Sequence, residues 1–228
     1  MDKSMLSLLQ LCDSNFPTGA FSHSFGLESY IQEGLVHDPA TFANWLGVYL
    51  NQQLVHADGL AARCVFDAVQ GNRPDEVWKW DRLLTVQNLA RETREGTQKM
   101  GDRMLALIAS MYSFPLLSQY RERIRGKASF GHPAVVFTMT GHHLRASRED
   151  TLVFYLYSVV VGLVQNAVRA IPLGQTAGQR IIRDVQEALP AAVDRILALD
   201  EEDFGVLSPG IELSQMKHER VNIRIFMS

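Results

Sequence analysis

The stretch Leu152-Val-Phe-Tyr-Leu-Tyr-Ser-Val-Val-Val-Gly-Leu-Val164 is the most apolar run of the chain and decides its fold. It is too short to cross a bilayer, which needs about 20 residues. We therefore expect a helix that is buried on most sides in the middle of a helical bundle. A weak capping box, Ser147 to Asp150, precedes this helix, and Pro172 stops it because proline disfavours helix at the residue before it.

Helix signals recur on both sides of this run. Asp38-Pro39 is a helix opening, with Asp38 as N-cap and Pro39 at the first helical position. Gly59 could divide the helix that follows, and Pro190 separates the last two helical segments. The remaining periodic segments predict helices over 5–11, 21–32, 40–69, 76–89, 91–111, 115–126, 134–144, 174–189 and 191–199.

The fold class that follows is all-α: a single-domain helical bundle of about eight to ten helices with a flexible C-terminal tail. We expect an all-helical domain over residues 1–200 and a partner-binding tail over 201–228. The one strand-like pattern is in the tail, where apolar residues alternate over Val221-Asn-Ile-Arg-Ile-Phe-Met227. An apolar alternating tail needs a surface that covers it.

Composition excludes several functions. Apolar residues make up 46% of the 228 residues, which is enough for a large core. The formal net charge is −3 and no block of lysine or arginine occurs, so we expect neither nucleic acid nor a membrane as partner. Two cysteines, Cys12 and Cys64, form no disulfide framework, and no signal peptide is evident. These features predict a cytoplasmic protein.

Motifs for resident metals and nucleotides are absent from the sequence. The histidines are at positions 23, 37, 56, 132, 142, 143 and 218, and no two are three or four apart, the spacing that aims two ligands from one helix. Neither a phosphate-binding GxxxxGK[ST] loop nor a GxGxxG turn is present. We therefore predict no cofactor, no tight metal site and no nucleotide hydrolysis by the chain alone.

The stretch Ser14-Asn-Phe-Pro-Thr-Gly-Ala-Phe-Ser-His-Ser-Phe-Gly-Leu-Glu28 resembles an active-site loop in composition. A small helical hydrolase that uses His23 and Ser24 is one interpretation. Neighbouring side chains on a helix diverge, however, and no GxSxG elbow occurs. The alternative is structural: hydroxyl groups cap a helix, Gly19 permits a tight turn and the phenylalanines pack. We predict no catalytic residue here.

A second unusual stretch, Arg169-Ala-Ile-Pro-Leu-Gly-Gln-Thr-Ala-Gly-Gln-Arg180, joins two helices through a proline–glycine corner. Gln175 and Gln179 are four residues apart and share a helix face, with Arg183 one turn further on. Glutamine offers donors and acceptors without charge, so this face suits either a polar interface or solvent.

Three stretches together resemble the urease accessory protein family UreF. They are Ser14-x-x-Pro-x-Gly-x-Phe-x-His-Ser-x-Gly-Leu-Glu28, the corner Ile171-Pro-Leu-Gly-Gln-x-x-Gly-Gln179, and the ending from Ser208-Pro209 through Met216-x-His-Glu219 to Arg224-x-Phe-x-Ser228. Gly131-His-Pro-Ala134 is also similar to the family. The resemblance spans essentially the whole chain.

The resemblance implies a helical, dimeric scaffold without enzymatic activity. Its implied partners are the accessory protein UreD, also called UreH, the GTPase UreG and apo-urease, and its implied role is to support nickel delivery and modulate the GTPase. His23 and His218 are the best candidates for transient nickel contact; a stand-alone nickel carrier is the remaining alternative. The residues expected to face partners are Pro17, Gly19, His23, Glu28, Arg169, Gln175, Gln179, Arg183, Met216, His218, Glu219, Arg224 and Phe226.

Overall fold

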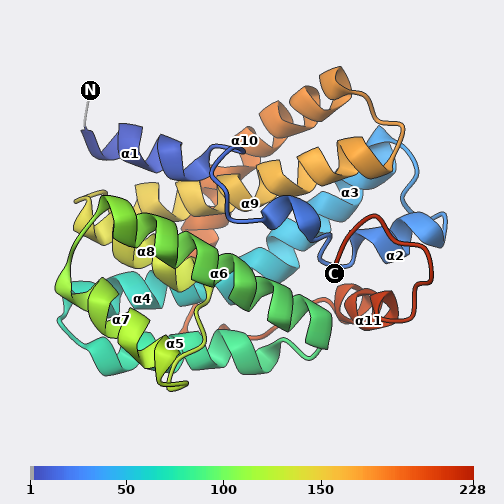
Figure 1. Cartoon of the computed structure of the whole chain (residues 1–228). Helices are drawn as coiled ribbons and strands as arrows, with labels where there is room; N and C mark the ends of the chain where they lie inside the picture. The colour runs from blue at the N-terminus through green and yellow to red at the C-terminus, as the bar shows by residue number, and fades with distance from the viewer. Residues whose placement is uncertain (1–2) are drawn as a thin grey trace.

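The computed structural model describes residues 3–228 and is built from helices alone (Figure 1). No strand occurs in those residues, which confirms the all-α fold class. In chain order the elements are α1 (Lys3–Cys12), the 3₁₀ turn η1 (Ala20–Ser22), α2 (Leu27–Gln32), α3 (Pro39–Val48), the π-helix η2 (Tyr49–Gly59), α4 (Leu60–Gln70), α5 (Pro74–Gln87), α6 (Arg91–Met111), α7 (Pro115–Arg125), α8 (Pro133–His143), α9 (Arg148–Ala170), α10 (Gln175–Ala198), the 3₁₀ turn η3 (Glu201–Asp203) and α11 (Pro209–His218).

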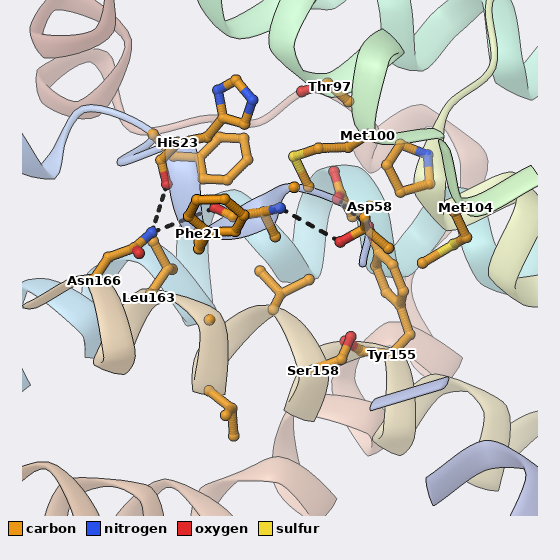
Figure 2. A pocket seen from close by; sticks show the side chains of 18 of the residues that line it. Phe21, His23, Asp58, Thr97, Met100, Met104, Tyr155, Ser158, Leu163 and Asn166 are labelled. Atoms are coloured by element: carbon orange, nitrogen blue, oxygen red, sulfur yellow. Dashed lines mark hydrogen bonds between the residues drawn. The ribbon is translucent and has the colours of Figure 1, made fainter. Parts of the chain in front are cut away.

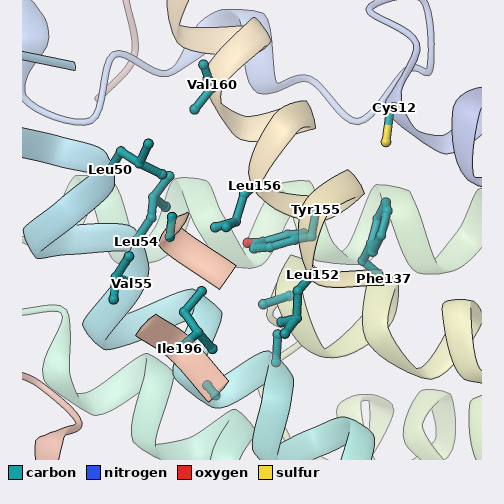
Figure 3. Close-up of a cluster of buried hydrophobic side chains, with 14 of the residues drawn as sticks. Cys12, Leu50, Leu54, Val55, Phe137, Leu152, Tyr155, Leu156, Val160 and Ile196 are labelled. Atoms are coloured by element: carbon teal, nitrogen blue, oxygen red, sulfur yellow. The ribbon is translucent and has the colours of Figure 1, made fainter. Parts of the chain in front are cut away.

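Helix α9 lies at the centre of the bundle, as its apolar run predicted. It packs against α10, α8 and α1, and Leu152, Leu156 and Val160 are fully buried (Figure 3). By length and composition alone α9 could cross a membrane, but half of its most apolar window is buried inside the protein. That is the behaviour of a core helix. The Ser147 hydroxyl caps α9 by accepting a hydrogen bond from the Asp150 N–H at 2.9 Å.

A continuous helical path runs from α3 through η2 to α4. Asp38 caps α3 as predicted: its carboxylate accepts from the Thr41 N–H at 2.8 Å, and Pro39 occupies the first turn. The helix does not break at Gly59, the expected division. It widens into the π-helical segment η2 instead, and a Cβ at Gly59 would lie 2.4 Å from Cδ1 of Ile196. Gly59 is therefore a point of close helix packing.

Two predicted helix boundaries are wrong. Helix α10 continues through Pro190, although proline in a helix interior costs about 3 kcal/mol. Pro190 is exposed, while Leu189 and Val193 on either side are buried, so packing of the flanking residues holds the helix together. The single helix expected over 21–32 is instead η1 and α2, because Phe25 and Gly26 have φ of 52° and 93°, outside the helical region.

The chain beyond α10 returns to the bundle, where α11 packs on α2 and α6 (Figure 1). Residues 221–228 form bends and coil, so the strand-like alternation of the sequence does not produce a strand. Exposure alternates only at the end of the segment: residues 222–225 and Met227 are exposed, whereas Phe226 and Ser228 are buried. The backbone N–H groups of this segment bind a carboxylate and a loop, which leaves no partner strand for a sheet.

Candidate functional site

The N-terminal stretch and the C-terminal segment, about 200 residues apart in the sequence, meet in the structure. The Met227 N–H donates to the Ser22 carbonyl at 2.7 Å, and the Ser24 N–H donates to the Ser228 carbonyl. Two of the three stretches that carried the family resemblance therefore form one site. Its base is the loop around η1, and its outer layer is the end of the chain.

Glu28 is the centre of this site, although it is only 3% exposed. Its Oε1 accepts from the Ile225 N–H at 2.6 Å, and its Oε2 accepts from the Phe226 N–H at 3.1 Å. The same Oε2 lies 2.8 Å from Nε2 of His218. Through these contacts the buried carboxylate fixes the backbone of the C-terminal segment.

His218 is fully buried, and both of its ring nitrogens face carboxylates. Nδ1 lies 3.1 Å from Oε2 of Glu92 on α6, on the ring edge away from Glu28. The guanidinium of Arg224 donates to both Glu92 oxygens at 2.8 Å. Burial opposes the charged form of Glu92, but hydrogen bonds from Arg224 and His218 hold its pKa below the usual value. The cluster thus ties α2, α6, α11 and the C-terminal segment together.

His23 is buried beneath the C-terminal segment, with Nδ1 2.8 Å from Oγ of Ser228. Its backbone carbonyl accepts from Nδ2 of Asn166 on α9 at 2.7 Å (Figure 2). Burial, followed by the charges of Lys99 and Arg103 on α6 and of His218, lowers the pKa of His23 to about 4. The ring is therefore neutral at physiological pH.

Two glycines give the N-terminal loop its shape. Gly19 has φ of 84°, and a Cβ there would lie 2.3 Å from a guanidinium nitrogen of Arg103. Gly26 has φ of 93°, and its Cβ would lie 2.3 Å from Oγ of Ser214 on α11. Both positions favour glycine for their backbone conformation, and Gly26 also lacks space for a Cβ because the Ile211 carbonyl lies 3.3 Å from that position. Pro17, which precedes this turn, is exposed.

Arg169 also belongs to this site, beside the two chain segments. Its guanidinium donates to the Phe21 carbonyl at 2.7 Å and lies over two rings, 5.9 Å from the centroid of Phe21 and 5.3 Å from that of Phe226. Phe21 is largely exposed and Phe226 is buried. The arginine therefore bridges the N-terminal loop and the C-terminal segment through a carbonyl and two cation–π contacts.

The other predicted residues are more peripheral. Glu219 accepts from the Arg91 N–H at 3.1 Å, and Met216 is partly buried on α11. Gln175, Gln179 and Arg183 are exposed along the first turns of α10. They share a face, as their spacing predicted, but they are not part of the buried cluster.

A cavity of about 300 Å³ extends from this site through the bundle (Figure 2). Its wall includes His23, Thr97, Met100 and Asn166 near the N-terminal loop and reaches His132 at the start of α8. Among residues 3–228, several buried polar atoms of the wall have no hydrogen-bonding partner within the protein: Gln53 Oε1, Gln87 Oε1, Asn88 Oδ1, Thr93 Oγ1 and Asn166 Oδ1. The cavity therefore suits a small polar occupant or water.

The loop that begins α8 is fixed by a buried carboxylate. Asp81 on α5, fully buried, accepts from the Tyr120 hydroxyl at 2.6 Å, the Phe130 N–H at 2.7 Å and the His132 N–H at 3.1 Å. These bonds explain the stretch Gly131-His-Pro-Ala134: it is a structured turn that places His132 in the cavity wall.

The geometry does not support a hydrolase at His23 and Ser24. Ser24 is fully buried, and its Oγ accepts a long hydrogen bond, 3.4 Å, from the Glu28 N–H. The His23 ring lies against Ser228 instead. In the part of the chain that the structure describes, no three His, Cys, Asp or Glu side chains are placed to hold one metal ion. At His218, for example, the carboxylates of Glu28 and Glu92 contact different ring nitrogens, so the three groups do not point toward one common position.

Sequence reasoning missed Glu92 and Asn166. Glu92 lies in the charged start of α6, where a glutamate at the first turn of a helix is ordinary. Asn166 was the better signal, because it is an uncharged polar residue near the end of the most apolar helix, and it is 1% exposed. Its partners are carbonyls of the N-terminal loop, which no local pattern predicts.

The known proteins that are similar to this chain belong to one family. A family model described as UreF matches residues 36–186. A urease accessory protein UreF from Lachnoclostridium phytofermentans is 49% identical over 228 residues, covering 100% of both chains. A urease accessory protein UreF from Bacillus sp. (strain TB-90) is 48% identical over 224 residues, 98% of this chain and 99% of the relative.

The class defined by these findings is that of accessory proteins for urease maturation, which assist an enzyme and are not enzymes themselves. Within that class, the chain belongs to the UreF family.

Proposed function

We propose that this chain is a cytoplasmic, homodimeric scaffold that bridges UreD (UreH) and the GTPase UreG during nickel delivery to apo-urease, and that it modulates the GTPase. The observation that carries the proposal is the joined site itself. A buried cluster of Glu28, His218 and Glu92 holds two chain segments in one surface but brings together no catalytic or metal-ligating set. Such a construction supports recognition rather than chemistry.

The surface proposed for UreD is the C-terminal region. Ile223, Ile225 and Met227 are exposed there at 86%, 55% and 59%, beside the exposed ring of Phe21. Exposed apolar side chains held on an ordered backbone are the usual composition of a protein interface. Met216, Glu219 and Arg224 would lie at its edge, and Phe226 would support it from below.

The surface proposed for UreG is the start of α10. Gln175, Gln179 and Arg183 are exposed on one face, and the helix begins directly after the Pro172–Gly174 corner. Uncharged amides can form directional hydrogen bonds to a partner without burying charge, and the charge of the Arg183 guanidinium is already paired with Asp184. Arg169 links this corner to the N-terminal loop, so a partner at either surface could affect the other.

The route proposed for nickel is the central cavity, in whose wall His23 stands. The side-chain amide and hydroxyl oxygens of the wall that have no protein partner could contact a hydrated ion briefly. A complete set of ligands around the ion would instead retain the ion. The stand-alone carrier is the competing hypothesis. Equilibrium dialysis distinguishes the two, since a carrier requires stoichiometric Ni²⁺ binding tighter than about micromolar by the chain alone.

A pull-down with purified UreD and UreG tests the scaffold. We expect Ile225→Asp to abolish capture of UreD and Gln175→Ala with Gln179→Ala to weaken capture of UreG. Gln186→Ala, an exposed glutamine further along α10, is the matched control and should change neither. Absence of any stable complex at micromolar concentration with the unmodified chain would reject the proposal.

A further inference from the structure

Residues 219–228, here called the strap, lie across the N-terminal loop and are held mainly by hydrogen bonds. Backbone bonds join Met227 to Ser22 and Ser24 to Ser228, and Glu28 accepts from two strap N–H groups. Nε2 of Gln32 donates to the Ile223 carbonyl at 2.9 Å, and the Arg224 guanidinium binds Glu92. These anchors are on α2, α6 and the loop before α2.

Apolar anchoring of the strap is slight. Phe226 is buried, while Ile223, Ile225 and Met227 point to solvent. Segments with few buried apolar contacts open at a lower free energy than the whole domain. The strap can therefore undock while the bundle remains folded.

The layer directly beneath the strap is His23. One side of this residue faces the strap, through Nδ1 and Oγ of Ser228, and the residue also lines the central cavity with Thr97 and Asn166 (Figure 2). The strap is not itself in the cavity wall, so it acts by holding the wall in place. When it leaves, residues 22–24 lose their backbone bonds to the strap and His23 loses its contact with Ser228.

We propose that the strap is a removable closure: its docking seals the His23 end of the central cavity, and its undocking opens that end to water and small solutes. This step belongs to the chain alone. It needs no partner protein, so the failure of the pull-down above and the failure of this proposal are separate results.

Thiol labelling tests the closure. Thr97→Cys places a thiol in the cavity wall close to His23, in a Cys12→Ser background that removes the other thiol of the wall. The native Cys64 is buried outside the cavity wall and reports global unfolding. A small neutral methanethiosulfonate is the probe, and mass spectrometry of the digested protein measures each site separately.

Loosening the strap should raise the labelling rate of the introduced thiol about tenfold and leave that of Cys64 unchanged. Arg224→Ala removes the bonds to Glu92, and Phe226→Ala removes the buried ring. Lys217→Ala is the matched control, because it breaks only the exposed ion pair with Glu33 beside the strap. It should label at the unmodified rate.

Two outcomes overturn the proposal: an introduced thiol that labels equally slowly in every variant, or one whose rate rises only together with that of Cys64. A second measurement needs no strap variant. In increasing urea below the unfolding transition, labelling at position 97 should show a shallow dependence on denaturant, as expected for local opening, while Cys64 shows the steep dependence of global unfolding. Identical slopes at the two sites would also refute it.

Discussion

Replacing Glu28 with glutamine tests whether one carboxylate holds the two chain segments together. The side chain keeps its size, but one oxygen becomes an NH₂ group. If the NH₂ group replaces Oε1, it faces the Ile225 N–H, which in the native chain donates to Oε1 at 2.6 Å. If it replaces Oε2, it faces the Phe226 N–H, which in the native chain donates to Oε2 at 3.1 Å. Either way a backbone donor loses its acceptor and meets another donor in a buried site.

The size of the effect follows from these contacts. A hydrogen bond to a charged group contributes about 1.5–3 kcal/mol, and leaving a buried donor without its acceptor costs about 1–3 kcal/mol. Glu28→Gln loses one such bond and sets two donors against each other in a buried site, so we expect the free energy of unfolding to fall by about 3 kcal/mol. With a urea m-value of about 3 kcal/mol/M, the unfolding midpoint should fall by about 1 M.

Urea unfolding followed by far-ultraviolet circular dichroism measures this shift. Glu33→Gln is the matched control: it is the same substitution just beyond the end of α2, in an exposed ion pair with Lys217, and should change the free energy of unfolding by less than about 1 kcal/mol. If Glu28→Gln unfolds at the midpoint of this control, the carboxylate does not hold the site and the reasoning fails.

Three further outcomes are expected. A Cβ at Gly96 would lie 2.6 Å from the ring of His23, so Gly96→Ala should lower the melting temperature. Gly47→Ala, at a helical position with no neighbour within reach of a Cβ, should increase the free energy of unfolding by about 0.5–1 kcal/mol. Calorimetry of the two variants measures both effects. The pKa of His23 is lowered from 6.5 to about 4, so the unfolded chain binds a proton more readily than the folded chain. As the pH is lowered from 6.5 to 4, the free energy of unfolding should therefore decrease, by no more than about 1.4 kcal/mol per pH unit. His23→Asn should flatten that slope, and an unchanged slope would contradict the assignment. Asp81→Asn turns a donor toward the Phe130 N–H and should cost about 2–4 kcal/mol in urea unfolding; a loss below 1 kcal/mol would show that the bond is unimportant.

Local signals in the sequence predicted much of the fold. Asp38, Ser147 and the apolar run of α9 act through neighbours within one or two turns, so their consequences can be read from spacing. Pro190 misled because its local penalty is overridden by buried residues on either side, and burial depends on the whole bundle. Phe25 adopts a positive φ, which the chemistry of a phenylalanine side chain does not predict.

The candidate site was only partly predictable for the same reason. The sequence singled out Glu28 and His218 but could not show that 190 residues of chain bring them to within hydrogen-bonding distance. Arg169 was expected beside the glutamines of α10, and the structure places its guanidinium on the N-terminal loop. Residue types and motif positions were recoverable; pairings between distant segments required the tertiary structure.

The number of residues in the π-helical segment η2 sets the rotation of α4 relative to α3. A π-helix carries a wider turn than an α-helix. If the segment keeps its winding, removing one residue from Tyr49–Gly59 rotates every side chain beyond the deletion by up to about 100° relative to those before it. Asp58 would turn away from the Tyr155 hydroxyl that it now accepts at 2.6 Å, and the buried face of α4 would turn toward solvent. This part of the molecule should therefore accept many substitutions but no change in residue count.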